Sequence, residues 1–231
     1  IPKNFFPPGK YTQKAYVDIF ANWVVKHGYE KSIQRGVQAS RPDVHYTLPP
    51  MPDLLFPHGL KIEPFPYQKQ GIAYALQKKR CFFGDQPGLG KTLQAIGTSF
   101  IAKAWPVLVI CPASLKINWQ REWKKFTGKD AIILDDRNRN NWYRYFEMGC
   151  CDVFITNYES LKKFFVEDFA GGITRSIRLK REASLFKCVI IDESHRCKSS
   201  KTQQSKICYK ICQGKEYRFL LTGTPSINGP K

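Results

Sequence analysis

The sequence predicts an α/β fold in which a mostly parallel sheet is flanked by helices, and three observations support this. Continuous apolar runs at 107–110 and 189–191 are typical of strands that are buried on both faces. Strand and helix patterns alternate from about Leu60 onward, as expected when a crossover helix follows each strand. A short apolar run at 81–83 leads directly into a glycine-rich turn and a helical pattern.

Residues 1–60 have a different character from the rest of the chain. Apolar residues recur at a near-helical period from Tyr11 to about Gln38, and Gly28 breaks this period. Prolines at positions 42, 49, 50, 52 and 57 then rule out a regular helix. We therefore expect a small helical accessory with a proline-rich connector in residues 1–60, followed by one larger domain in residues 61–231.

Each element of the larger domain can be placed in order. The predicted helices cover 67–79, the stretch from the glycine-rich turn to about 103, 114–126, 141–147, 159–166 and 202–212. The predicted strands cover 80–84, 106–111, 131–134, 152–156, 187–192 and 217–222. Trp119, Trp123, Phe82 and Phe83 are expected in the core.

Residues 167–186 interrupt this alternation with a glycine pair and four basic residues. One interpretation is a solvated surface insertion. The other is a basic loop that contacts nucleic-acid phosphates through Arg175 and Arg178.

The composition indicates a polyanionic partner. The 231 residues include 37 basic and 19 acidic side chains, which gives a net charge of +18. Such an excess favours nucleic acid, although a surface that merely maintains solubility is the alternative.

The eight cysteines contain no Cys-x-x-Cys pair, and there are only four histidines, so no structural zinc is expected. Several cysteines lie in apolar runs, which suggests a reducing, intracellular compartment: a nucleus, or a bacterial or viral-host cytoplasm. No run approaches the roughly 20 apolar residues of a membrane span, so no membrane partner is expected.

Residues 84–92 form a glycine-rich turn that ends in Lys-Thr and opens a helix, a pattern typical of nucleotide triphosphate binding. Gly88 and Gly90 let backbone N–H groups face the phosphates, and the helix N-terminus adds positive potential. Lys91 would reach the β- and γ-phosphates, and the Thr92 hydroxyl would bind Mg²⁺. Asp85 stands where the generic pattern has its first glycine.

A second motif follows about 100 residues later, where an apolar strand ends in Asp192-Glu193. Asp192 would hold Mg²⁺, directly or through water, and Glu193 would orient and deprotonate the attacking water. The alternative is an acidic pair that caps the next helix. Both motifs lie at strand ends and in the expected order, so the sequence predicts nucleotide hydrolysis.

Together these motifs resemble the first, RecA-like lobe of a helicase superfamily-two ATPase, and within it the Swi/Snf-type remodelling and translocase family. The resemblance covers about residues 62–230. Its further motifs are Pro66–Gly71, Cys111–Leu115 with Trp119 one helical turn later, Ile155–Glu159, Asp192–Lys198, and Leu221–Pro225 with Asn228. The family's phosphate loop also carries aspartate at position 85. Departures from the family pattern are Gln86-Pro87 for Glu-Met and Ser194 for Ala.

The resemblance implies roles for individual residues. Gln68 would read adenine, and Leu89 belongs to the phosphate loop. His195 would link Glu193 to Thr222 or Thr224, and Gly223 would share their role in coupling hydrolysis to movement. The implied catalytic residues are Lys91, Asp192, Glu193 and His195. The implied nucleic-acid contacts are Ser114, Lys116, Thr156 and Asn157, and the basic segment 167–186 adds Arg175 and Arg178 as candidates on its charge.

Structural alternatives remain for several of these residues. Gln68 could be a plain helix-surface residue and His195 a packed core histidine. Ser114 and Thr156 could be simple helix N-caps, with or without a phosphate contact.

The function implied by the resemblance is the ATP-binding lobe of a DNA-dependent ATPase that translocates on double-stranded DNA. ATP and Mg²⁺ would be its cofactors, and a second RecA-like lobe with an arginine finger would complete it. The isolated lobe is expected to bind ATP weakly and to hydrolyse it very slowly. Two alternatives stay open: an unwinding helicase lobe acting on DNA or RNA, and a non-catalytic nucleic-acid-binding module with a relic nucleotide fold.

Overall fold

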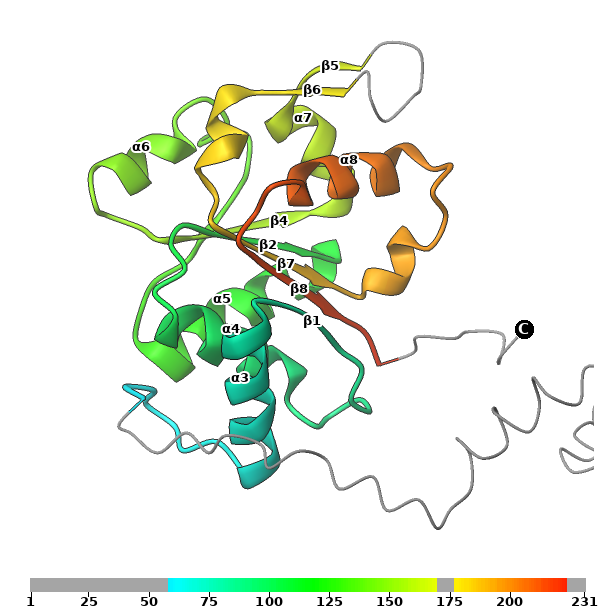
Figure 1. Ribbon diagram of the computed structural model, residues 1–231. Helices are drawn as coiled ribbons and strands as arrows, with labels where there is room; N and C mark the ends of the chain where they lie inside the picture. The colour runs from blue at the N-terminus through cyan, green and yellow to red at the C-terminus, as the bar shows by residue number, and fades with distance from the viewer. Residues whose placement is uncertain (1–57, 170–176, 224–231) are drawn as a thin grey trace, which may run out of the picture. The chain divides into compact units, whose positions relative to one another are not determined.

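A parallel sheet of six strands is the centre of the domain, in the order β1-β8-β7-β2-β4-β3 (Figure 1). The computed structural model describes residues 58–169 and 177–223, so almost all of the predicted extension in residues 1–60 lies outside it. The boundary at residue 60 stays a prediction. The strands are β1 (Arg80–Phe83), β2 (Val107–Cys111), β3 (Ile132–Ile133), β4 (Val153–Asn157), β7 (Cys188–Asp192) and β8 (Tyr217–Leu221).

Helices cover both faces of this sheet. On one face lie α3 (Pro66–Lys78), α4 (Lys91–Ile101) and α5 (Lys116–Thr127), and on the other lie α6 (Trp142–Glu147), α7 (Leu161–Phe165) and α8 (Gln203–Cys212) (Figure 1). Because successive strand residues point to opposite faces, Val107 and Val109 of β2 pack into the core beneath α4 and α5. Leu108 and Ile110 pack into the core beneath α6–α8. The predicted α/β fold is confirmed.

Several predicted boundaries are corrected by the structure. The helix expected at 114–126 begins as a 3₁₀ turn at Ala113–Leu115, and the α-helix starts only at Lys116. The helix expected at 159–166 is a 3₁₀ turn at Tyr158–Ser160 followed by the five-residue α7. The strand expected at 131–134 pairs with β4 over only two residues.

The interruption at 167–186 contains an antiparallel pair, β5 (Val166–Phe169) with β6 (Ile177–Leu179), and a 3₁₀ segment at Arg181–Leu185. It is more than a solvated insertion, because Ile177, Ala183 and Phe186 are each buried in the core under α6–α8. Arg175 lies outside the described residues.

The prediction that Phe82 lies in the core is wrong, since half of its surface (50%) is exposed. β1 lies at the edge of the sheet, and only one of its faces is covered by helices, so Phe83 is buried while Phe82 is not.

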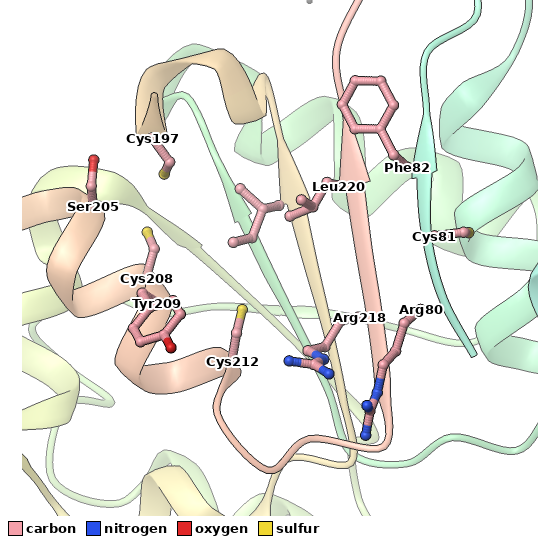
Figure 2. Close-up of a pocket in the computed structure, with 11 residues that line it drawn as sticks. Arg80, Cys81, Phe82, Cys197, Ser205, Cys208, Tyr209, Cys212, Arg218 and Leu220 are labelled. Carbon is pink, nitrogen blue, oxygen red and sulfur yellow. The ribbon is translucent and has the colours of Figure 1, made fainter. Parts of the chain in front are cut away.

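On the open face a groove of about 490 Å³ runs between β1, β8 and α8. Figure 2 shows Phe82 and Leu220 along its sheet side and Cys208 and Cys212 on α8 opposite.

Within residues 58–169 and 177–223, none of the helices has the length and apolar character needed to cross a bilayer. The eight cysteines are all free thiols.

Candidate functional site

Because the strands are parallel, their carboxyl ends all lie at the same end of the sheet, and the sequence motifs meet there. The phosphate loop, residues 84–90, follows β1 and leads into α4. Asp192 is the last residue of β7, and Glu193 follows it. Thr222 and Gly223 follow β8. Ser114 follows β2 at the same end. Residues that are far apart in the chain therefore meet because their strands run in the same direction.

Backbone conformation shapes the phosphate loop. Gly88 and Gly90 have φ angles of +86° and +76°, a region that side chains rarely adopt. A Cβ atom at Gly90 would also lie 2.3 Å from Nε2 of Gln68. The Lys91 ammonium donates to the backbone carbonyls of Asp85 (2.7 Å) and Gln86 (3.0 Å). The loop thus curls around a single positive charge at the start of α4.

Asp85 connects this loop to α4 through a side-chain hydrogen bond. Its Oδ2 atom accepts a hydrogen bond of 2.7 Å from Nε2 of Gln94, which is buried in α4. Gly71 of α3 makes room for that amide, because a Cβ there would lie 1.9 Å from Oε1 of Gln94. The aspartate that departs from the generic loop therefore ties the loop to the helix that follows it.

Gln68 is buried, so it is not a plain helix-surface residue. Its Nε2 atom donates to the carbonyl of Leu89 in the phosphate loop (3.2 Å), and its Oε1 atom accepts from the backbone N–H of Phe65 (3.0 Å). The Tyr67 hydroxyl donates to the same Leu89 carbonyl (3.1 Å). The structure places Gln68 against the loop, and its role toward adenine stays a prediction.

Two N–H groups hold the Asp192 carboxylate. Nε1 of Trp119 donates to Oδ2 (2.8 Å), and the backbone N–H of Glu193 donates to Oδ1 (2.9 Å). Burial raises the pKa of Asp192, while the Trp119 hydrogen bond acts in the opposite direction. The Tyr158 hydroxyl donates to the Asp192 carbonyl (2.5 Å) and to that of Glu193 (3.3 Å).

Glu193 adopts a left-handed conformation, with φ 52° and ψ 48°. Such a conformation costs a non-glycine residue on the order of 1–3 kcal/mol and is concentrated at functional sites. Glu193 lies directly after β7, where the alternative interpretation of the sequence predicts that the acidic pair caps a helix. The segment that follows is a short 3₁₀ turn, and no side-chain cap bond is present at Glu193.

His195 lies between the acidic motif and the end of β8. Its Nδ1 atom is 3.0 Å from Oγ1 of Thr222 and 3.1 Å from Oε2 of Glu193. The structure therefore shows the contact that the family resemblance implies for Thr222, while Thr224 lies outside the described residues. A Cβ on Gly223 would come 2.8 Å from Cγ of Pro87, so this segment also lies against the phosphate loop.

Glu122 is a component of the site that sequence reasoning missed. Its Oε2 atom is buried with no hydrogen-bond partner, and its Oε1 atom accepts from Nδ2 of Asn118 (3.1 Å). Burial raises its pKa, while the Asn118 hydrogen bond and the charge of Lys125 lower it. The nearby charge of Asp192 raises it again, and the nearby Thr92 hydroxyl lowers it. The available signal was the spacing of Trp119 and Glu122, which places both on one face of a helix.

Thr92, Asp192 and Glu122 therefore bring a hydroxyl and two carboxylates together. Oxygen ligands of this kind suit Mg²⁺, which is commonly held by one or two carboxylates together with substrate phosphates. The orphaned Oε2 atom of Glu122 fits such a site. In the described parts of the chain no three His, Cys, Asp or Glu residues form a metal site by themselves.

The predicted nucleic-acid contacts separate into two groups. Ser114 is exposed in its 3₁₀ turn, and Nζ of Lys116 is 3.4 Å from Oδ1 of Asn157 at the end of β4. Asn157 also accepts from Ser160 (2.9 Å). Arg178 lies apart on β6, where it forms an ion pair of 3.0 Å with Glu167.

Thr156 requires a correction. Its side chain is fully buried inside β4, and its hydroxyl has no hydrogen-bond partner, so a phosphate cannot meet it in this conformation. The N-cap interpretation is also wrong for both candidates, because Thr156 lies within a strand and Ser114 within the 3₁₀ turn before α5.

Residues 22–231 match the SNF2-related domain. The chain belongs to this family. It is 34% identical over 181 residues to the human DNA annealing helicase and endonuclease ZRANB3, covering 76% of this chain and 16% of that protein. It is 30% identical to the Caenorhabditis elegans homologue of SWI/SNF-related matrix-associated actin-dependent regulator of chromatin subfamily A-like protein 1, covering 72% of this chain and 22% of that protein.

A solved structure of the same family has a similar fold. The SWI2/SNF2 ATPase core of Sulfolobus solfataricus, in complex with double-stranded DNA, superimposes with a TM-score of 0.59 at 28% identity. The match covers 75% of this chain and 34% of that one. The chain thus spans only a part of the length of these relatives. The predicted family membership is confirmed.

The unpaired Oε2 atom of Glu122 leads to a stability prediction. Glu122→Gln is expected to raise the free energy of unfolding near neutral pH by about 1 kcal/mol, because it removes a buried charge. In the wild type the pKa is higher in the folded than in the unfolded state, so stability falls as pH rises from about 4.5 through the folded pKa. Urea unfolding of this SNF2-related lobe without metal should therefore show a larger gain at pH 8 than at pH 4.

Glu159→Gln is the matched control. A hydrogen bond from Asn157 holds the pKa of Glu159 below its ordinary value, so this carboxylate stabilises the fold as pH rises. Its replacement should destabilise the lobe more at pH 8 than at pH 4. A gain from Glu122→Gln that does not change with pH would contradict the prediction.

Proposed function

We propose that this chain is the ATP-binding lobe of a DNA-dependent ATPase that uses ATP and Mg²⁺ to translocate on double-stranded DNA. The observation that carries the proposal is the convergence of Lys91, Asp192, Glu193 and His195 at one end of the sheet, with His195 in contact with both Glu193 and Thr222. This set supplies a cation for the phosphates, oxygen ligands for a metal and a carboxylate base. Membership in the SNF2-related family supports the same function.

The chemistry follows from the positions of these groups. The Lys91 ammonium would exchange the loop carbonyls for the β- and γ-phosphates of ATP. Thr92 and Asp192 would hold Mg²⁺, which neutralises charge on the phosphates when bound. Glu193 would orient and deprotonate the water that attacks the γ-phosphate.

His195 provides a route from hydrolysis to movement. A change in charge at Glu193 alters its interaction with His195, and His195 contacts Thr222 beyond the end of β8. Thr222 in turn donates its backbone N–H to the carbonyl of Phe83 at the start of the phosphate loop (3.2 Å). These contacts support the proposed coupling role of Thr222 and Gly223.

Double-stranded DNA is the proposed partner. The net charge of +18 provides affinity for a polyanion without a requirement for sequence readout. Ser114, Lys116 and Asn157 lie at the same end of the sheet and are the groups that we place against the DNA backbone. We further propose that a second RecA-like lobe supplies an arginine for the transition state, and that free thiols reflect an intracellular location.

The test is ATP hydrolysis by the intact ATPase with no nucleic acid, duplex DNA, single-stranded DNA or RNA, with Glu193→Gln as the blank. Strong stimulation by duplex DNA is the expected result. Stimulation by single strands or RNA alone would replace the proposal with an unwinding helicase. If no condition gives hydrolysis that depends on Glu193, the chain is a binding module with a relic nucleotide fold.

A further inference from the structure

Trp119 makes a polar contact in addition to its packing in the core. The indole is almost completely buried (1% exposed), yet its Nε1 atom donates a hydrogen bond of 2.8 Å to Oδ2 of Asp192. The contact joins α5 to the end of β7, across 73 residues of chain. The sequence alone places Trp119 in the core, and the structure adds a specific partner.

This contact decides how the carboxylate is oriented. A carboxylate is fixed in its plane when each oxygen accepts a separate hydrogen bond. At Asp192 one donor is the N–H of Glu193, which belongs to the same strand end, and the other donor is Trp119 from α5. The Glu193 N–H belongs to the adjacent peptide and moves with Asp192. The hydrogen bond from Trp119 is therefore the one that fixes the carboxylate relative to another element, α5. Partners of this kind orient metal ligands, and their loss typically costs about 10- to 100-fold in metal affinity.

The position of Trp119 along α5 adds a second consequence. Trp119 lies near the start of the helix, three residues after Lys116 and five after the exposed Ser114. A helix transmits displacement as a rigid element, so a contact that moves the start of α5 also moves the indole N–H relative to Asp192. Lys116 is held toward Asn157 by a long contact of 3.4 Å, and this contact would be exchanged easily for a phosphate.

We propose that Trp119 is a positioning residue through which α5 holds Asp192 in its metal-binding orientation and links nucleic acid bound at the start of α5 to the nucleotide site. This inference rests on the proposed function, because it needs Mg-ATP at Asp192 and nucleic acid near Lys116. Trp119 does not touch the reacting atoms and acts only through Asp192.

The chain contains a matched control on the same helix. Trp123 is also fully buried, but its Nε1 atom has no hydrogen-bond partner. Replacing either tryptophan with phenylalanine removes a similar volume from the core beside the sheet. Only the Trp119→Phe change removes a donor from Asp192, so the difference between the two variants isolates the hydrogen bond from the packing.

The experiment measures protection of this chain against thermal unfolding by ATP while Mg²⁺ is titrated. Trp119→Phe should need about 10- to 100-fold more Mg²⁺ for half-maximal protection. Trp123→Phe should stay within about twofold of the wild type, even if both variants melt at a lower temperature. Equal Mg²⁺ dependence in the two variants would overturn the inference. A wild type that Mg-ATP does not protect would instead overturn the proposed function.

A second measurement covers a Trp119→Phe variant that does not fold. Indole N–H resonances of the ¹⁵N-labelled wild type report each tryptophan separately, and Trp123→Phe helps their assignment. The resonance of Trp119 should exchange slowly with solvent and move when Mg-ATP is added. Duplex DNA should move the same resonance. If no indole resonance responds to Mg-ATP, Trp119 does not position Asp192; if DNA binds without moving it, α5 does not carry the link.

Discussion

Replacing Lys91 with alanine is expected to abolish the protection that Mg-ATP gives this chain against unfolding. The Lys91 ammonium donates to the carbonyls of Asp85 and Gln86 at the centre of the phosphate loop. Without it, these carbonyl dipoles would face the phosphates with no cation between them. At an ATP concentration 100 times Kd, the wild type should gain about 2.7 kcal/mol. For a chain of this size, that gain corresponds to a rise in Tm of roughly 5–10 °C.

Lys78→Ala provides the control for this prediction. Lys78 lies in the last turn of α3, so its removal changes the net charge equally without touching the phosphate loop. This variant should keep the whole protection by Mg-ATP. A Lys91→Ala protein that is still protected at the wild-type ATP concentration would contradict the role given to Lys91, and with it the interpretation of residues 84–92 as a phosphate loop.

The elements that could be predicted are those whose pattern is local. The apolar runs of β2 and β7 are buried on both faces, as their composition requires. The glycine-rich turn after β1 could be identified because φ angles near +80° at Gly88 and Gly90 demand a residue without a side chain.

Burial at particular positions depends on strand order, which the sequence pattern does not contain. Phe82 and Phe83 look equally apolar, but β1 lies at the sheet edge and only Phe83 is covered. Thr156 belongs to a sequence motif, yet β4 lies inside the sheet and buries it completely. In both cases the neighbouring strand or helix decides the exposure, and these neighbours come from distant parts of the chain.

The candidate site divides in the same way. Lys91, Asp192 and Glu193 could be predicted because each motif carries its chemistry in adjacent residues. Glu122 and the hydrogen-bonding role of Trp119 could not, since they depend on how α5 is rotated against β7. That rotation is set by packing of the buried face of α5 on the sheet, and helix periodicity alone does not determine which strand end the face meets.

Glu193→Gln is expected to reduce ATP hydrolysis by the intact ATPase by about 10²- to 10⁴-fold, because general-base catalysis contributes on this scale. Glutamine has almost the same shape as glutamate, so the left-handed turn after β7 and the packing near His195 should be kept. What is lost is the ability to accept a proton from the attacking water. Protection of this chain by Mg-ATP should therefore remain close to that of the wild type, in contrast to Lys91→Ala.

The two readouts together separate catalysis from binding. Glu167→Gln, which removes an exposed carboxylate from β5, should change neither hydrolysis nor protection. Loss of protection in Glu193→Gln would show that Glu193 helps to bind the nucleotide, and hydrolysis within about tenfold of the wild type would show that another group is the base.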